Sequence, residues 1–307
     1  MSKTAFIFPG QGAQYAGMGK DFYDEIPVCR EVIQMAGEIS GLDLPKICFT
    51  EDDRINITEY TQTAILSVEA AILKALQDAG ISADTCAGLS LGEYGACLAS
   101  KTLTYEDAFY LVRKRGIYMQ EAVPFGGAMS AVIGADTETV KKICEETEGI
   151  VSVANYNCPG QVVITGQEEA VKVASEKIKE TGRVRVLPLK VSGPFHSPML
   201  KEAGAQLKEA LEKITLHTPE IPYISNVTAD YVTDAATAER LLVEQVSSSV
   251  RWQQSMERML QDGVDTFLEI GPGKTLTNFM KKIDRKAVVY NIQNTEDFKK
   301  TVDLLLK

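Results

Sequence analysis

Residues 85–99 read TCAGLSLGEYGACLA, and this stretch decides how the chain presents its most reactive side chain. The short segment 85–88 leads into Ser90 as a strand would, and the residues after Ser90 predict a helix. Ser90 then lies on the turn between strand and helix, within the pentapeptide GLSLG at 88–92. Flanking glycines allow the close backbone approach that such a turn requires. A serine that only caps a helix is the alternative, and the strand–turn–helix context favours a nucleophile.

Two backbone amides near this turn are candidates for an oxyanion hole. The amide of Leu91, at the start of the predicted helix, is placed to donate to a developing negative charge. A second glycine-rich loop, FPGQGAQ at 8–14, follows a predicted strand at 4–8. In a doubly wound sheet this loop lies at the carboxyl ends of the strands, so the amide of Gln11 becomes the second candidate donor. A plain turn is the alternative, and Tyr15 breaks the dinucleotide-binding pattern.

A serine nucleophile needs a base, and the chain has only two histidines. His196 lies in the loop GPFHSP at 193–198, directly after a predicted strand. His217 lies between a predicted helix and an extended stretch, and a structural or surface role is favoured for it. We predict His196 as the base because its loop lies where two folded units would meet. No acidic partner for the base can be chosen, and a backbone carbonyl could orient the ring instead.

The order of predicted elements divides the chain. Residues 127–192 predict strand, helix, strand, strand, helix and strand, which is the order of a ferredoxin-like α+β unit. We therefore expect a small inserted domain at 127–192. The segments 1–126 and 193–307 would together form a discontinuous large α/β domain with a mostly parallel sheet.

Composition excludes several classes of function. Lys and Arg total 32 against 42 Asp and Glu, a net charge of −10, which argues against nucleic-acid binding. No stretch approaches the length of a membrane span, and the N-terminal apolar run is too short for a signal peptide. The six scattered cysteines predict reduced thiols in a cytoplasmic protein, without a metal site. The stretch GPGKT at 271–275 fails as a phosphate loop because Leu268 stands where the first glycine is required.

Several further motifs carry a resemblance to a known family. These motifs are FPGQGAQ at 8–14, GLSLGEY at 88–94, RGIYMQEAVP at 115–124, NYNCPGQVVITG at 155–166, GPFHSPM at 193–199 and EIGPGKTLT at 269–277. In this order, and over nearly the whole length, they resemble the malonyl-CoA:acyl-carrier-protein transacylases of fatty-acid synthesis. The resemblance implies a hydrolase-like large α/β domain with a ferredoxin-like insertion, and it implies no cofactor.

The resemblance also implies roles for individual residues. Ser90 would take a malonyl group from coenzyme A as an ester and pass it to the thiol of acyl carrier protein. His196 would act as base and acid in each half-reaction, and the amides of Gln11 and Leu91 would form the oxyanion hole. Arg115, which composition alone presents only as part of a basic cluster, would bind the malonyl carboxylate. A carbonyl near Val250-Arg251-Trp252, assigned to Arg251, would orient the base.

Two positions bear on selectivity and activity. Leu89 stands where this family usually has His, so any supporting role of that His is in doubt. Phe195 resembles malonyl-selective members, and its ring should disfavour a branched group such as methylmalonyl. An acidic carrier would need a local basic patch, for which the candidates lie near site motifs: Lys190, Lys201, Arg251, Lys281 and Lys282.

Three other interpretations stay open, and a monomer is expected for each. A serine thioesterase or esterase would release malonate to water without a carrier. A polyketide-pathway acyltransferase would use the same chemistry with a different carrier. A catalytically silent scaffold subunit has Leu89 as its only support.

Overall fold

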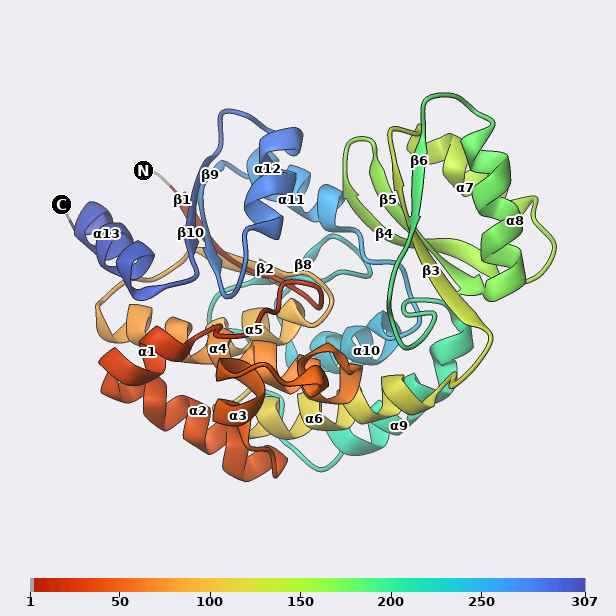
Figure 1. The fold of residues 1–307 in the computed structure, drawn as a ribbon. Coiled ribbons are helices and arrows are strands. Elements are labelled where there is room, and N and C mark those ends of the chain that lie inside the picture. The colour runs from red at the N-terminus through yellow and green to blue at the C-terminus, as the bar shows by residue number, and fades with distance from the viewer. Residues whose placement is uncertain (1–2, 307) are drawn as a thin grey trace.

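A computed structural model describes residues 3–306, which form a mixed α/β fold with two sheets. The larger sheet has six strands in the order β10-β9-β1-β2-β7-β8 (Figure 1). All neighbouring pairs in it are parallel except β7 and β8. Its strands are β1 (Lys3–Phe8), β2 (Thr85–Gly88), β7 (Tyr223–Ile224), β8 (Tyr231–Val232), β9 (Val264–Ile270) and β10 (Val288–Ile292).

Strand β1 lies in the interior of this sheet and is covered on both faces. Phe6 and Phe8 pack into one hydrophobic core, whereas Ala5 and Ile7 pack into another. Successive side chains of a strand point to opposite faces, so an unbroken apolar run fits a strand buried on both sides. The loops that follow β1, β2, β7 and β9 all leave the same carboxyl edge of the sheet.

Helices cover both faces of the larger sheet (Figure 1). The larger core is shared with α2, α4, α5, α6, α9 and α10, and the opposite core with α11 and α12. The helices before residue 127 are α1 (Lys20–Glu25), α2 (Pro27–Ser40), α3 (Leu44–Phe49), the 3-10 helix η1 (Asp53–Asn56), α4 (Thr58–Asp78), α5 (Gly92–Ala99) and α6 (Tyr105–Glu121). The helices after residue 190 are η2 (Pro198–Leu200), α9 (Lys201–Leu211), α10 (Ala235–Gln245), α11 (Trp252–Gln261), α12 (Thr275–Ile283) and α13 (Thr295–Leu305).

The second sheet is antiparallel, with the strand order β4-β5-β3-β6. It stands beside the larger sheet in Figure 1, with α7 and α8 on its outer face. One face packs with these helices into a separate core, while Met129, Ala154 and Val163 join the larger core. Its elements are β3 (Gly127–Ile133), α7 (Thr137–Glu145), β4 (Val151–Cys158), β5 (Gln161–Gln167), α8 (Glu168–Lys179) and β6 (Arg185–Pro188).

Local capping explains several element boundaries. Asp136 begins α7 as its N-cap, because its side chain accepts a hydrogen bond from Thr139 N. Helix α10 begins at Ala235 because Asp234 caps it by accepting from Thr237 N. Strand β6 ends at Pro188, four residues before the expected end of the small domain at 192.

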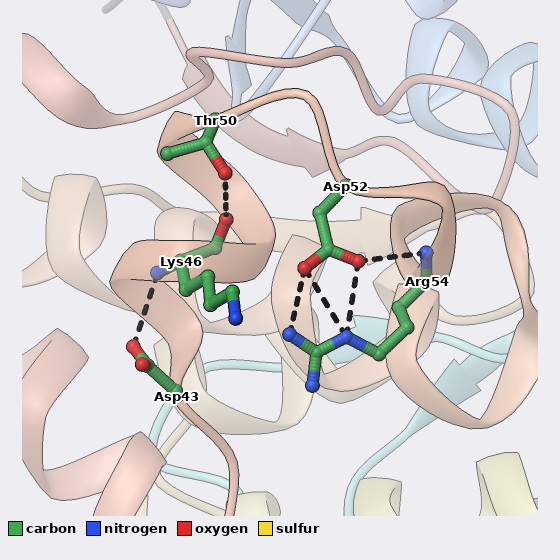
Figure 2. A network of polar contacts seen from close by, with 5 residues as sticks. All are labelled: Asp43, Lys46, Thr50, Asp52 and Arg54. Carbon is green, nitrogen blue, oxygen red and sulfur yellow. Dashed lines mark hydrogen bonds and ion pairs between the residues drawn. The ribbon is translucent and has the colours of Figure 1, made fainter.

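The segment before α4 is held by short-range polar contacts (Figure 2). Asp43 caps α3 by accepting from Lys46 N, and Thr50 Oγ1 donates to Lys46 O at the other end of that helix. Asp52 accepts from the backbone N, Nε and Nη2 of Arg54. This guanidinium holds the pKa of Asp52 at about 2. These contacts fix the chain that leads into α4, which contributes polar side chains to the site described below.

Three features of the described residues concern membrane spans, metal sites and cysteine pairing. Within residues 3–306, no helix combines the length and the apolar character that crossing a membrane requires. The same residues contain no group of three or more His, Cys, Asp or Glu side chains arranged to hold a metal ion. All six cysteines are free thiols in the interior.

Candidate active site

Ser90 lies on a strained turn between β2 and α5. Its φ is 56°, in the left-handed region that non-glycine residues rarely adopt. A Cβ on Gly88 would lie 1.8 Å from Gly92 O, and a Cβ on Gly92 would lie 2.1 Å from Phe8 O. Both glycines are therefore required for the chain to turn this tightly against β1. The turn presents the Ser90 hydroxyl at the carboxyl edge of the larger sheet.

Asn226, which follows β7, holds the strained turn from the neighbouring strand. Its Oδ1 accepts from Ser90 N at 2.6 Å, and its Nδ2 donates to Gly88 O at 2.7 Å. The side chain is fully buried. The sequence analysis missed Asn226, because no local pattern marks it. Its only signal is an amide residue two positions after an apolar segment.

His196 meets Ser90 from a different part of the chain. Its Nε2 lies 2.7 Å from Ser90 Oγ. Its Nδ1 lies 2.9 Å from Gln245 O and 3.1 Å from Ser248 O. Carbonyl oxygens only accept, so Nδ1 carries the proton and Nε2 of the neutral ring accepts from Ser90 Oγ.

The carbonyl groups that hold the His196 ring do not belong to the residue that the sequence predicted. The expectation placed this role at Arg251, but the structure places Gln245 O and Ser248 O on Nδ1. The carbonyl of Arg251 instead accepts from Ser255 N and Ser255 Oγ at the start of α11. The chain reaches the ring at the end of α10, a few residues earlier than the tripeptide at 250–252.

Burial sets the protonation state of His196. Desolvation is the largest effect, and the Arg115 charge adds to it, so the pKa of His196 falls to about 4. The two carbonyls act in the opposite direction but do not compensate. The imidazole is therefore neutral near pH 7 and ready to take a proton from Ser90.

Arg115 on α6 lies beside the same hydroxyl and is fully buried. Its Nη2 donates to Ser90 Oγ at 3.2 Å and to Gln245 Oε1 at 2.9 Å, while its Nη1 donates to Gln62 Oε1 at 2.7 Å. Its guanidinium carbon also lies 5.5 Å from the ring centre of Tyr94. Arg113, two residues earlier in the sequence, pairs with Glu59 and not with Ser90. The structure thus gives the two arginines different partners.

Gln245 connects these groups, and the sequence analysis did not identify it. Its backbone O holds His196, its Oε1 accepts from Arg115, and its Nε2 donates to Ser90 O at 2.9 Å. The same Nε2 donates to Glu93 Oε2 at 2.7 Å. Only tertiary structure brings the end of α10 to the nucleophile turn, so no local pattern could have found this residue.

The two predicted oxyanion donors lie next to Ser90. Gln11 and Leu91 both line the cavity in front of the hydroxyl. Among the described residues, the structure shows no hydrogen-bond partner for the backbone N–H of either one. The Gln11 side chain is fixed, because its Nε2 donates to Thr58 Oγ1 at 3.0 Å. Both N–H groups are therefore available to a ligand.

The cavity has a volume of about 200 Å³ and lies between the two sheets. Ser90, His196 and Gln62 line it from the larger α/β unit, and Met129 and Val163 line it from the antiparallel sheet. Apolar contributions predominate, which suits a small acyl group. The other lining residues are Gly10, Gly12, Ala13, Leu89, Met119, Asn155, Asn157, Leu189, Val191, Phe195, Thr275 and Phe279.

The remaining predicted residues are divided between this cavity and the surface. Phe195 is buried and lines the cavity, and Leu89 lines it from the turn itself. His217 is exposed and lies outside it. Asn157 on β4, which was quoted in a motif but given no role, has a buried Oδ1 with no partner among the described residues. Because Asn157 also lines the cavity, a polar group of a ligand is one partner that would satisfy this oxygen.

Comparison with known proteins agrees with this geometry. The acyl transferase domain family matches residues 5–300. The malonyl CoA-acyl carrier protein transacylase of Bacillus subtilis is 42% identical, over 99% of this chain and 98% of its own. The crystal structure of the transacylase of that name from Clostridium perfringens is 42% identical with a TM-score of 0.95, covering 99% of this chain and 98% of that one.

A further solved structure contains a malonyl-transacylase in complex with a type II PKS acyl-carrier protein. It is 36% identical, with a TM-score of 0.95, and covers 99% of this chain and 100% of that one. These alignments include both the larger α/β unit and the antiparallel sheet. The chain therefore belongs to the acyl transferase domain family and, within it, to the malonyl CoA-acyl carrier protein transacylases.

Proposed function

We propose that this chain transfers a malonyl group from coenzyme A to the phosphopantetheine thiol of acyl carrier protein, for fatty-acid synthesis, through an ester on Ser90. The observation that carries the proposal is the contact of 2.7 Å between Ser90 Oγ and His196 Nε2, with Arg115 Nη2 on the same oxygen. A neutral base and a cation thus both contact the nucleophile's oxygen, which opens onto one small cavity.

In the first half-reaction, His196 Nε2 takes the hydroxyl proton as Ser90 Oγ attacks the thioester carbonyl carbon. The carbonyl oxygen becomes an oxyanion that accepts from the N–H groups of Gln11 and Leu91. The C–S bond then breaks, and coenzyme A leaves as a thiol after taking the proton from His196. The carrier's thiol reverses these steps, giving its proton to His196 and leaving Ser90 with its hydroxyl restored.

Arg115 is the proposed partner of the malonyl carboxylate, since a guanidinium binds a carboxylate in a two-point geometry. Without substrate, its Nη1 is held by Gln62, which lines the cavity, and its Nη2 by Ser90 and Gln245. The carboxylate would replace Gln62 Oε1 and Ser90 Oγ on these two nitrogens. This clamp would also hold the ester away from an activated water, which favours transfer over hydrolysis.

We further propose two domains. The antiparallel sheet and its helices span residues 127–188, have their own core and follow the order expected of a ferredoxin-like unit. This supports a small inserted domain at 127–192 within a hydrolase-like domain formed by 1–126 and 193–307. Because one chain supplies every group at the site, a monomer suffices as the working unit. The six free cysteines favour the cytoplasm.

The proposed carrier docks near α12. Phe279 on this helix lines the cavity, and the exposed Lys281 and Lys282 follow it. A local basic patch of this kind would attract an acidic carrier to a protein that is itself acidic. Polyketide carriers are the second candidate class, because a relative of 36% identity is known in complex with one.

The test measures coenzyme A release from malonyl-CoA with and without acyl carrier protein. Transfer predicts one equivalent per chain without the carrier and continuous turnover with it. A thioesterase would instead turn over continuously without the carrier, and a silent scaffold would release nothing. Loss of both phases in Ser90→Ala assigns the reaction to Ser90, with Ser40→Ala as the control, because the Ser40 hydroxyl donates to carbonyls of its own helix α2 away from the cavity.

A further inference from the structure

Glu93 is a fully buried carboxyl behind the nucleophile that the acyl-transfer steps above do not use. It lies in the first turn of α5, three residues after Ser90. Its Oε2 accepts from Gln245 Nε2 at 2.7 Å and from Asn226 N at 3.2 Å. Burying a carboxyl group lowers the stability of the fold unless its hydrogen-bond partners compensate for the lost hydration. The burial of Glu93 behind the nucleophile therefore requires an explanation.

The first contact fixes the direction of the Gln245 side-chain amide. A carboxylate only accepts hydrogen bonds and a guanidinium only donates them. Glu93 therefore demands the NH2 end of the Gln245 amide, and Arg115 demands its oxygen. With the amide held from both ends, Nε2 also reaches Ser90 O at 2.9 Å. If Glu93 lost its charge, one of the two constraints on this amide would weaken.

The second contact extends to the other side of the turn. Asn226 donates its backbone N–H to Glu93 Oε2, while its side chain accepts from Ser90 N and donates to Gly88 O. Glu93 Oε2 is thus linked to the Ser90 N–H through Asn226 and to the Ser90 C=O through Gln245. These are the backbone groups that hold φ at 56°.

We propose that the Glu93 carboxylate is a positioning residue that orients Gln245 and Asn226 and so holds Ser90 Oγ in line with His196. This inference deepens the proposed function and rests on it. Because Gln245 also holds Arg115 and the Nδ1 side of His196, Glu93 links all three working side chains without touching substrate. Its ionised form is the active one.

Protonation of Glu93 should change the reactivity of Ser90, and this change can be measured as a function of pH. Burial raises the pKa of Glu93 to about 7, against the opposing effects of Gln245, Asn226 and Arg115. His196, with its pKa lowered to about 4, stays neutral above pH 5.5, and Arg115 stays charged. The other titratable groups facing Glu93 have pKa values raised by burial and stay neutral: Tyr94, Cys97 and Tyr223. Between pH 5.5 and 8.5 Glu93 is therefore the group of this network that titrates.

The experiment measures how fast a small alkyl fluorophosphonate labels Ser90 between pH 5.5 and 8.5. This reagent needs an aligned serine and base but neither malonyl-CoA nor a carrier. The parent should show a rate that rises about ten-fold through a step near pH 7. Glu93→Gln should give a flat profile close to the parent's rate at low pH, because its side chain copies the neutral acid. A parent profile without a step overturns the proposal, whether or not any variant folds.

Two controls separate this role from a general loss of structure. Glu244→Gln makes the same chemical change one residue from Gln245, at a half-exposed side chain that pairs with Arg240. Glu69→Gln removes another fully buried carboxyl that makes no hydrogen bond to this network. Both should keep the step. A step retained in Glu93→Gln, or lost in Glu69→Gln, assigns the titration to another group and contradicts the proposal.

Malonyl loading, measured in parallel, distinguishes the two proposals. If the parent labels with fluorophosphonate and shows the step but takes no malonyl group, the proposed function fails while the positioning role stands. If the parent loads malonyl without the step, the positioning role fails and the proposed function stands. A Glu93→Gln protein that loads malonyl at the parent's rate at pH 8.5 also contradicts the positioning role.

Discussion

The imidazole of His196 lies 2.7 Å from the hydroxyl of Ser90 although 106 residues separate them along the chain. Both residues have a left-handed backbone, with φ of 58° and 56°. Such a conformation costs energy in residues other than glycine and persists only where surrounding contacts hold it. Asn226 and Gln245 supply these contacts at Ser90, and Ser197 Oγ donates to Pro194 O beneath His196. The fold thus holds strain at both reacting groups.

Replacing Arg115 should affect malonyl far more than acetyl. Arg115→Ala removes the proposed carboxylate partner, and a hydrogen bond to a charged group contributes about 1.5–3 kcal/mol. Single-turnover loading of Ser90 from malonyl-CoA and acetyl-CoA should show the malonyl-to-acetyl ratio falling by about 100-fold. Acetyl loading also falls somewhat, because Gln245 Oε1 loses its donor.

Arg113→Ala is the matched control for that experiment, since Arg113 lies on the same helix and pairs with Glu59 outside the cavity. Its loading ratio should equal the parent's. Equal losses of malonyl and acetyl loading in Arg115→Ala would show that Arg115 only supports the structure.

Phe195 should limit the width of the acyl group. The ring is buried and lines the cavity next to His196. Phe195→Ser opens space for one methyl group, a difference that a pocket can convert into about 10- to 200-fold discrimination. Competition between methylmalonyl-CoA and malonyl-CoA should therefore shift toward methylmalonyl by about ten-fold or more. Met129→Leu, a volume-conserving change at a cavity residue on β3, should leave the ratio unchanged. A parent that uses both substrates equally well would remove the basis for this prediction.

Glu69 should make the protein less stable as the pH rises. It is fully buried on α4, and both carboxyl oxygens lack a partner among the described residues. Desolvation, with Glu269 nearby, raises its pKa well above the usual value. Above about pH 4.5 the unfolded chain releases this proton, whereas the folded state keeps it. The free energy of unfolding therefore falls as the pH rises above about 4.5.

Urea unfolding of Glu69→Gln and the parent at pH 5 and pH 8 measures this effect. The free-energy difference between the two should move in favour of the variant at pH 8. A difference that is the same at both pH values would mean that Glu69 ionises as freely in the folded protein as in the unfolded chain.

Short-range patterns predicted the parts of the site that local chemistry determines. The glycines around Ser90 are needed because no Cβ fits there, and that requirement is visible in GLSLG itself. His196 could be chosen because the chain has only two histidines and one of them follows a predicted strand in a rigid loop. Strands and helices within 85–179 were also predictable, since their apolar periodicity and caps are local.

Residues placed by tertiary structure could not be predicted in this way. The sequence placed the carbonyl that orients His196 at Arg251, whereas Gln245 O has this role in the structure. Sequence alone does not show where α10 ends relative to the imidazole. Asn226 follows β7, a strand of two residues that carries no periodic pattern. Strand β10 and helices α2 and α11 also received no prediction, and their place in the fold depends on packing against distant elements.

Transfer through Ser90 requires that this residue hold the malonyl group between its release from one thiol and its delivery to the next. Intact-mass spectrometry of the chain mixed with malonyl-CoA, and then with acyl carrier protein, tests it most directly. We predict one malonyl adduct, located on Ser90 by peptide mapping, that leaves the chain as the carrier gains the same mass. A chain that stays unmodified while the carrier becomes malonylated, or an adduct on any other residue, would rule out transfer through an ester on Ser90.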